Sequence, residues 1–320
     1  MSSVGLRKLL IKKSRHRRSS DLSLRKYFVA VSIAILAVLQ GYAFAETTDS
    51  PNRFSMPGTQ IFTLTSQHNE IEYEIRVWLP EDYARGGQAY PLTLLLDADY
   101  QFPLGVSILE HLAQRNQADE SVVVAVAYPN SQRNPYWYRR NRTRDYTPTM
   151  VSTGGYGAEF QQYSGGGDKF LRFIADDLMD SLQSRYRITS SGHTYVGHSY
   201  GGLYGAFIIA EQPDLFSNYL LISPSLWYDD RLMIRRMQQI ADLGLTDATR
   251  IYLAVGDHEN LTGRPMVDEL QMYAAAIREK ADPAADVEVR VFSDETHASI
   301  YPVALSAGLR HLWSSRTGQE

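Results

Sequence analysis

The stretch HTYVGHSYGGLYGAFIIAE, residues 193–211, decides the fold of this 320-residue chain. Its first four residues predict a short strand, and the apolar run over 203–211 predicts a helix. Between them lies Gly197-His198-Ser199-Tyr200-Gly201, which has the form G-x-S-x-G. When this motif follows a strand and opens a helix, it places its serine on a sharp, strained turn. We therefore expect Ser199 to be a nucleophile at a strand end; a plain glycine-rich turn is the alternative.

Strands and helices alternate from Leu92 onward, which predicts a mostly parallel central sheet with helices on both faces. Two earlier segments alternate apolar and polar residues and predict antiparallel strands at the N-terminal edge. The fold class is therefore α/β, with one domain over 58–315. The expected strands are Ile61–Thr65, Glu70–Leu79, Leu92–Leu96, Val122–Ala127, His193–Val196, Tyr219–Ile222, Ile251–Val255 and Val287–Phe292. The expected helices are Gly105–Asn116, Phe170–Tyr186, Leu203–Glu211, Leu232–Leu243, Pro265–Lys280 and Ile300–Trp313.

One long segment stands apart from this alternation. Residues 129–167 are rich in Arg, Tyr, Asn, Thr and Gly and predict an irregular insertion. A loop of this length in a compact domain is usually functional or mobile. Asp168 then has the position of an N-cap for the helix that follows.

The composition limits the chemistry. Hydrophobic residues make up 44% and charged residues 21% of the chain, as in an average globular protein. The chain has no cysteine, which excludes disulfides, thiolate metal sites and a cysteine nucleophile. Asp97 and Asp99 make only a weak metal site, because no His or further acid stands at a supporting spacing. We expect no metal and no cofactor.

The first 45 residues differ from the rest. Residues 1–26 hold nine Lys or Arg against one acid, and an apolar run, Tyr27–Leu39, follows. Ala43-Phe44-Ala45 then matches a small-x-small cleavage site. We expect residues 1–45 to be an export signal cleaved after Ala45, and 46–57 a flexible lead-in. The alternative keeps 27–45 as an uncleaved inner-membrane anchor.

The chain beyond residue 26 is acidic. It carries 23 basic and 35 acidic residues, a net charge of −12, whereas the whole chain has −4. An acidic body argues against binding to nucleic acid. We expect a small-molecule ester as the partner, no nucleic acid, and membrane contact only if the N-terminal segment stays uncleaved.

A serine hydroxyl is a poor nucleophile and needs a base, usually a histidine held by a carboxylate. His297 is the candidate base, because it lies after the last expected strand and before the last helix. The candidate acids are Asp257 and Glu259, which follow the strand at 251–255. Either could reach His297, and a Ser199–His297 dyad without a close carboxylate stays open.

Ester cleavage also needs two backbone N–H groups for the oxyanion. The Tyr200 amide is one candidate, since it opens the helix behind the serine and a helix N-terminus favours negative charge. The amide of Asp99, in the loop after Leu92–Leu96, is the other. A side chain at Gly197 or Gly201 is expected to collide with the neighbouring strand or helix.

The insertion also suggests a ligand site. Four arginines lie beside the aromatic run 136–138, and such a patch could hold an anionic aromatic ligand, such as an iron-bound catecholate, by charge and cation–π contact. They are Arg139, Arg140, Arg142 and Arg144. The alternative is a solvated loop with structural Arg–Asp pairs, such as Arg144 with its neighbouring aspartate. Tyr100 and Trp227, which follow other strand ends, are further candidate substrate-binding residues; a packing role for Trp227 is equally open.

Six motifs together resemble the esterase D / putative esterase family of α/β-hydrolases, over roughly residues 58–315. The resemblance implies an α/β-hydrolase fold, ester hydrolysis, Glu259 as the acid and the Asp99 amide in the oxyanion hole; Ala98 stands where the family more usually has glycine. The exported single-domain layout is most similar to periplasmic siderophore (enterobactin-type) esterases, which implies a periplasmic location and a ferric siderophore as a candidate substrate. The motifs are Leu95-Leu96-Asp97-Ala98-Asp99, Arg142-Thr143-Arg144-Asp145-Tyr146-Thr147-Pro148, Gly166-Gly167-Asp168-Lys169-Phe170-Leu171, Gly197-His198-Ser199-Tyr200-Gly201-Gly202, Ser223-Pro224-Ser225-Leu226-Trp227 and Gly256-Asp257-His258-Glu259.

The sequence leaves three hypotheses about the function. The main hypothesis is a serine carboxylic-ester hydrolase that forms an acyl-enzyme on Ser199 with His297 as general base. A narrower alternative is a specific hydrolase of ferric catecholate trilactone siderophores. An alternative of another class is a non-catalytic protein that binds a ligand in the same pocket.

Overall fold

The computed structural model describes residues 55–129, 134–262 and 264–317. The expected export signal or anchor at 1–45, and most of the lead-in, lie outside the described residues. From Ser55 onward the chain forms one compact unit. In the described ranges, no helix combines the length and the apolar character that a membrane span requires.

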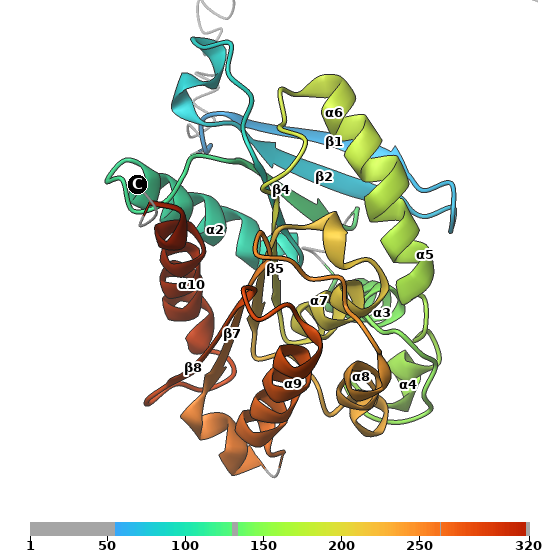
Figure 1. Cartoon of the computed structure of the whole chain (residues 1–320). Coiled ribbons are helices and arrows are strands. Elements are labelled where there is room, and N and C mark those ends of the chain that lie inside the picture. Colours follow the sequence, from blue (N-terminus) through green and yellow to red (C-terminus); the bar gives the residue numbers. More distant parts are fainter. Residues whose placement is uncertain (1–54, 130–133, 263, 318–320) are drawn as a thin grey trace, which may run out of the picture. The chain divides into compact units, whose positions relative to one another are not determined.

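An eight-stranded sheet runs through the centre of this unit (Figure 1), in the order β1-β2-β4-β3-β5-β6-β7-β8. The strands from β4 to β8 pair in parallel, and β1 and β2 add an antiparallel edge. The predicted α/β-hydrolase fold, with a mostly parallel sheet, is confirmed. The strands are β1 (Thr59–Thr65), β2 (Glu72–Trp78), β3 (Leu92–Leu95), β4 (Val122–Ala127), β5 (Thr194–His198), β6 (Asn218–Ile222), β7 (Arg250–Gly256) and β8 (Asp286–Phe292).

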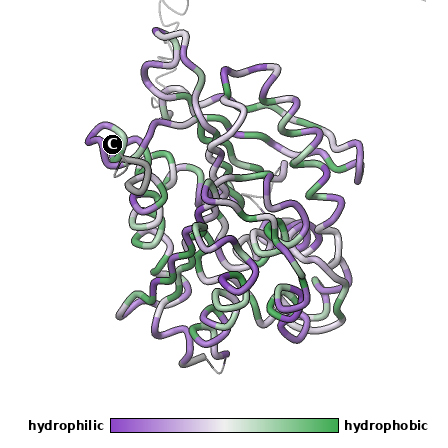
Figure 2. The backbone as a smooth tube through the Cα atoms, in the orientation of Figure 1, coloured by the Kyte–Doolittle hydropathy of each residue, from purple (hydrophilic) through white to green (hydrophobic). Residues whose placement is uncertain are grey.

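Helices cover both faces of the sheet (Figure 1), so the inner strands β3 to β6 are buried along their whole length. On one face, α2 and α10 pack through residues such as Val106, Leu109 and Leu305. On the other face, α5 to α9 bury a larger core. Figure 2 shows the hydrophobic residues gathered along the central strands and the helix sides that face them. The helices are α2 (Ala98–Ala113), α3 (Pro135–Asp145), α4 (Ala158–Gln161), α5 (Gly167–Arg172), α6 (Met179–Arg185), α7 (Tyr200–Glu211), α8 (Tyr228–Gln239), α9 (Met266–Lys280) and α10 (Ile300–Thr317).

The insertion is more ordered than the sequence predicts, because it holds α3 and α4. Asn134 caps α3 by accepting a hydrogen bond from the Tyr136 N–H at 3.0 Å, and Pro135 occupies the first turn. The sequence hides this helix because its inward residues are polar: Arg142, Thr143 and Asp145 are the buried ones. Hydrophobic periodicity, the main helix signal, is therefore missing.

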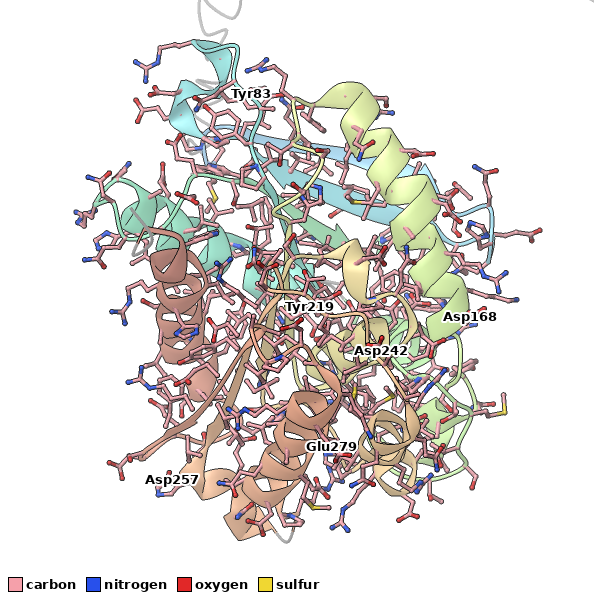
Figure 3. All side chains as sticks on the ribbon, viewed as in Figure 1. Tyr83, Asp168, Tyr219, Asp242, Asp257 and Glu279 are labelled. Atoms are coloured by element: carbon pink, nitrogen blue, oxygen red, sulfur yellow. The ribbon has the colours of Figure 1, made fainter. Side chains whose placement is uncertain are left out.

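Four helices, α2, α5, α7 and α8, begin three to seven residues earlier than expected. Helix α2 begins at Ala98 and runs through Pro103, whereas the expected helix began after that proline because proline usually interrupts a helix. Helix α5 has Gly166, not Asp168, at its N-cap. The N–H groups of Gly166 and Gly167 bond to carbonyls of the insertion at 2.9 and 3.0 Å, which fixes the helix start there. The Asp168 carboxylate lies on the outside (Figure 3) and pairs with Arg172.

The segment 167–185 is a continuous helical unit that begins three residues before the expected helix Phe170–Tyr186 and ends one residue before its end. A π-helical turn over Phe173–Leu178 joins α5 to α6. Its buried side chains, Phe173, Ile174 and Leu178, pack into the core on the β1–β2 side of the sheet. The predicted apolar spacing is therefore correct, while the local winding is not visible in the sequence.

Candidate active site

Ser199 stands on a sharp turn between β5 and α7. Its φ of 60° and ψ of −116° lie in a region that residues with a side chain rarely adopt. Its N–H donates to the Ile222 carbonyl on β6 at 3.0 Å, and its own carbonyl accepts from the Leu203 N–H at 2.9 Å. The turn that the G-x-S-x-G motif predicts is therefore present, strained in its dihedrals and fixed by hydrogen bonds on both sides.

The glycines around the serine have different roles from those expected. A Cβ at Gly197 would overlap the carbonyl oxygen of Gly201, so this glycine is required for the close approach of strand and helix. At Gly201 itself the nearest atom would be 3.7 Å away, an ordinary contact, and the expected collision there is wrong. The second crowded position is Gly202, where a Cβ would lie 2.8 Å from the Cα of Pro224.

Glu259 is the carboxylate that the structure places at His297. The two are joined by a 2.6 Å hydrogen bond from His297 Nδ1 to Glu259 Oε2. Glu259 is 1% exposed, and its Oε1 accepts from the Gly256 N–H at 2.8 Å and from Ser223 Oγ at 2.5 Å. These hydrogen bonds hold the carboxylate in one orientation toward the imidazole.

Asp257, the other candidate acid, points elsewhere. Its side chain is 41% exposed, and its carboxylate lies 3.9 Å from the ring of His258. Figure 3 shows Asp257 at the periphery of the molecule, after β7. The turn after β7 therefore directs only Glu259 inward, and His297 has a carboxylate partner in the structure.

Ser199 and His297 line the same cavity, which has a volume of about 580 Å³. The Ser199 hydroxyl lies 3.5 Å from the hydroxyl of Ser225, which belongs to the wall of this cavity. Tyr200 and Trp227 contribute aromatic side chains to the wall. The cavity thus has a strained serine, an oriented imidazole and apolar surface, the combination that a site for an aromatic or aliphatic ester requires.

A second histidine, His198, supports the loop that carries His297. Its Nε2 lies 2.9 Å from the His297 carbonyl oxygen and must donate there, because a carbonyl only accepts. Its Nδ1 is then the acceptor for the Tyr100 hydroxyl at 3.2 Å. Burial, together with the charges of His297 and Arg142, lowers the pKa of His198 to about 3, so the ring stays neutral. Tyr100 therefore acts on the His297 loop through His198 and is not among the residues of the cavity wall.

The two expected oxyanion amides both lie in the first turn of a helix: Tyr200 opens α7, and Asp99 is the second residue of α2. Arg76 holds the second of these turns by donating to the Ala98 carbonyl at 3.1 Å and to the Asp99 carboxylate at 2.9 Å. Asp97, with φ of 51°, takes the left-handed conformation at this turn. Ala98 has no positive φ, so alanine fits where the family more usually has glycine.

Arg142 lines the cavity, but its charge is already neutralised. It is 3% exposed and makes a two-point ion pair with Asp97, at 2.7 and 2.9 Å. It also donates to the His198 carbonyl at 3.0 Å and to the Tyr156 hydroxyl at 2.9 Å. Arg142 therefore connects the insertion, the strand-end loop and the residue before Ser199, and it acts as a structural link at the base of the cavity.

Arg144 does not belong to the cavity. Its guanidinium makes a two-point ion pair with Asp145 at 2.7 and 2.8 Å and a further hydrogen bond to Asn141. The expectation that it binds substrate is corrected, and the alternative Arg–Asp pair is what the structure contains. Arg142 and Arg144 are two residues apart on α3, so they leave the helix on different sides and reach different surroundings.

Trp227 lines the cavity as expected, and it has a partner that the sequence reasoning missed. The guanidinium of Arg264 lies 3.8 Å from the centre of the Trp227 ring, and both residues belong to the cavity wall. Tyr156 and Ser225 are two further wall residues that were missed. Ser225 could have been found from its place in the Ser-Pro-Ser-Leu-Trp motif; Arg264 follows η5 (Asp257–Thr262) with no local signature. Within the described ranges, no cluster of three His, Asp or Glu residues could hold a metal ion.

Comparison with known proteins gives a consistent family. A family model described as "Putative esterase" matches residues 66–301. The ferri-bacillibactin esterase BesA of Bacillus subtilis is 28% identical over 279 residues, which cover 83% of this chain and 94% of that protein. The siderophore enterobactin esterase of Emericella nidulans is 26% identical over 272 residues, which cover 75% and 89% of the two chains.

A solved structure supports the same conclusion. The chain resembles an IroE-like serine hydrolase from Shewanella oneidensis with a TM-score of 0.68, 29% identity and 80% coverage of each chain. The fold, the strained serine and the family match agree with one another. The chain thus belongs to the putative esterase family of α/β-hydrolases and is a carboxylic-ester hydrolase of the serine type.

Proposed function

We propose that the reaction proceeds through an acyl-enzyme on Ser199. His297 Nε2 takes the proton of the serine hydroxyl while Oγ attacks the ester carbonyl carbon. The alcohol leaves with that proton; His297 then deprotonates a water, which attacks the acyl group, releases the carboxylic acid and restores Ser199. Glu259 keeps the His297 tautomer with Nδ1–H toward it and stabilises the imidazolium. The 2.6 Å bond between Glu259 and His297 at the cavity of Ser199 is the observation that carries this mechanism.

The amides of Tyr200 and Asp99 are proposed to hold the oxyanion. Each lies in the first turn of a helix, α7 or α2, where N–H groups lack intrahelical acceptors and the helix dipole favours negative charge. Arg142 and Arg76 fix the two turns from behind. Such preorganised donors are worth roughly 3–4 kcal/mol each to a transition state of this kind.

We further propose a catecholate siderophore ester as the natural substrate. The support comes from the named activities of the relatives and from the wall of the cavity, where Tyr156, Tyr200 and Trp227 offer aromatic surface. A volume of about 580 Å³ is within the range of small-molecule sites and suits one aromatic acyl arm with its ester. The remainder of a trilactone would then lie outside the cavity.

Export to the periplasm is proposed on the sequence alone. The basic segment at 1–26, the apolar run and the Ala43-Phe44-Ala45 site support cleavage after Ala45. N-terminal sequencing of the protein recovered from a periplasmic fraction should begin at Glu46. Recovery of the uncleaved chain with the membranes would support the anchor at 27–45 instead.

A substrate panel with the wild type and Ser199→Ala tests the proposed function. The wild type should hydrolyse p-nitrophenyl acetate and, with higher kcat/KM, a catecholate trilactone; Ser199→Ala should lose both activities by at least about 10⁴-fold while its circular dichroism is unchanged. A wild type that binds the trilactone but cleaves neither ester, and that a fluorophosphonate does not label, would indicate a non-catalytic binding protein.

A further inference from the structure

The mouth of the cavity carries a cation that stacks on an aromatic ring. Arg264 lies in the short segment between η5 and α9, is exposed, and places its guanidinium 3.8 Å from the centre of the Trp227 ring. Both side chains belong to the cavity wall. A guanidinium over an indole is the strongest common form of cation–π contact, and it leaves the N–H groups at the edge of the guanidinium available to a ligand.

Among the described residues, no acid cancels the charge of Arg264. In the part of the chain that the structure describes, no carboxylate lies within ion-pair distance of it. Of the other charged side chains of the wall, Arg142 pairs with Asp97, and Glu259 is 1% exposed and hydrogen-bonded to His297. The charge that the wall exposes at the mouth is therefore the positive charge of Arg264, although the chain beyond residue 26 carries a net charge of −12.

A second stacked cation lies on another side chain of the wall. The guanidinium of Arg139, on α3, lies 5.5 Å from the ring centre of Tyr156, which lines the cavity and is 37% exposed. Arg139 likewise has no carboxylate partner within residues 55–129, 134–262 and 264–317. Two elements far apart in sequence, α3 and the segment before α9, thus each present an uncompensated guanidinium on an aromatic residue of the same cavity.

We propose that these two pairs, Arg264–Trp227 and Arg139–Tyr156, select the iron-loaded form of a catecholate ester over its iron-free form. The proposal rests on the proposed substrate class. Free catechols are neutral near pH 7, whereas three catecholates bound to Fe³⁺ are deprotonated and give a trianionic complex. A neutral ligand gains only stacking on the aromatic residues; the trianion gains stacking and charge pairing with both guanidinium groups.

Binding to a catalytically silent chain tests this selection apart from turnover. On a Ser199→Ala background, isothermal titration calorimetry with ferric and with iron-free enterobactin should give a Kd at least about tenfold lower for the ferric complex. Adding Arg264→Gln should reduce the ratio of the two Kd values about tenfold, and Arg264→Lys should restore part of it, since lysine keeps the charge without the planar stack. Arg172→Gln, an exposed arginine of α5 paired with Asp168, is the matched control and should leave the ratio unchanged.

The ratio also guards against partial unfolding, because both ligands report on the same folded fraction. Equal Kd values for the two ligands, or a ratio that Arg264→Gln leaves unchanged, would overturn the proposal. Failure of the proposed function looks different: the wild type would not cleave either trilactone, while the Ser199→Ala chain could still bind the ferric form more tightly.

Discussion

Two arginines of one cavity, Arg142 at its base and Arg264 at its mouth, differ in burial and in ion pairing. Arg142 is buried, bonded to Asp97 at two points and to the backbone before Ser199. Arg264 is exposed and stacks on Trp227. A buried and paired charge organises structure and adds little field, whereas an unpaired one at the mouth attracts ligands. Arg142 therefore organises the structure at the base of the cavity, and Arg264 has the proposed role of ligand binding at its mouth.

The largest effect is expected at the base, from the acid that orients His297. Glu259→Gln should lower kcat by about 10⁴-fold with a small change in KM. The uncharged amide can favour the wrong imidazole tautomer, and it does not stabilise the imidazolium that forms during the reaction. Asp257→Asn, two residues away and partly exposed, is the matched variant and should stay within about twofold of wild type. Equal losses in both variants would show that the buried and exposed acids do not differ as the geometry indicates.

Removing the buried arginine should mainly affect stability. Arg142→Met leaves the Asp97 carboxylate buried without its partner and should lower the free energy of unfolding by about 3–5 kcal/mol. The measurement is urea denaturation, with Arg172→Met as the exposed control. In the double variant Arg142→Met/Asp97→Leu much of the loss should be recovered. A loss that the second substitution does not reduce would assign the effect to packing instead of charge.

His198 gives a prediction for pH. Its pKa is lowered in the folded state to about 3, so between that value and the ordinary value near 6.5 the unfolded chain binds the extra proton. This ring therefore makes the free energy of unfolding fall by roughly 2 kcal/mol as the pH drops from 7 to 5. His198→Gln, which can still donate to the His297 carbonyl, should show a smaller loss across the same interval in urea denaturation. An identical loss in both proteins would contradict a neutral, buried His198.

A smaller effect is expected from Tyr100→Phe. The hydroxyl that donates to His198 Nδ1 is lost, but the bond from His198 to the His297 carbonyl remains. We expect kcat to fall by less than about tenfold with KM unchanged, since a single hydrogen bond behind the base contributes roughly 1 kcal/mol. If KM for p-nitrophenyl acetate rises by a larger factor than kcat falls, Tyr100 contacts the substrate instead.

The candidate catalytic residues and Trp227 could be predicted from sequence, and Arg264 could not. Ser199 and His297 follow strand ends, and the parallel order of the strands brings such ends to one edge of the sheet. The choice between Asp257 and Glu259 needed the family resemblance, because both follow the same strand. Arg264 belongs to no sequence motif, and its cation–π contact with Trp227 is visible only in the folded structure.

The insertion shows the opposite difficulty, because Arg142 and Arg144 are conspicuous in the sequence but do not form the predicted ligand-binding patch. The sequence suggests that Arg142 and Arg144 share one patch, but on a helix they face different surroundings, and each already has an aspartate. The helix itself was hidden since its buried face consists of charged and polar residues. Sequence patterns report apolar burial well; they do not report which charges have been paired.

The activation of Ser199 by His297 is the central step of the proposed reaction. Mass spectrometry of the chain during p-nitrophenyl acetate turnover tests this directly. We expect an acetyl group on the peptide that contains Ser199, formed in the wild type and absent in His297→Ala. Acetylation of another residue, or of Ser199 at an unchanged rate in His297→Ala, would contradict it.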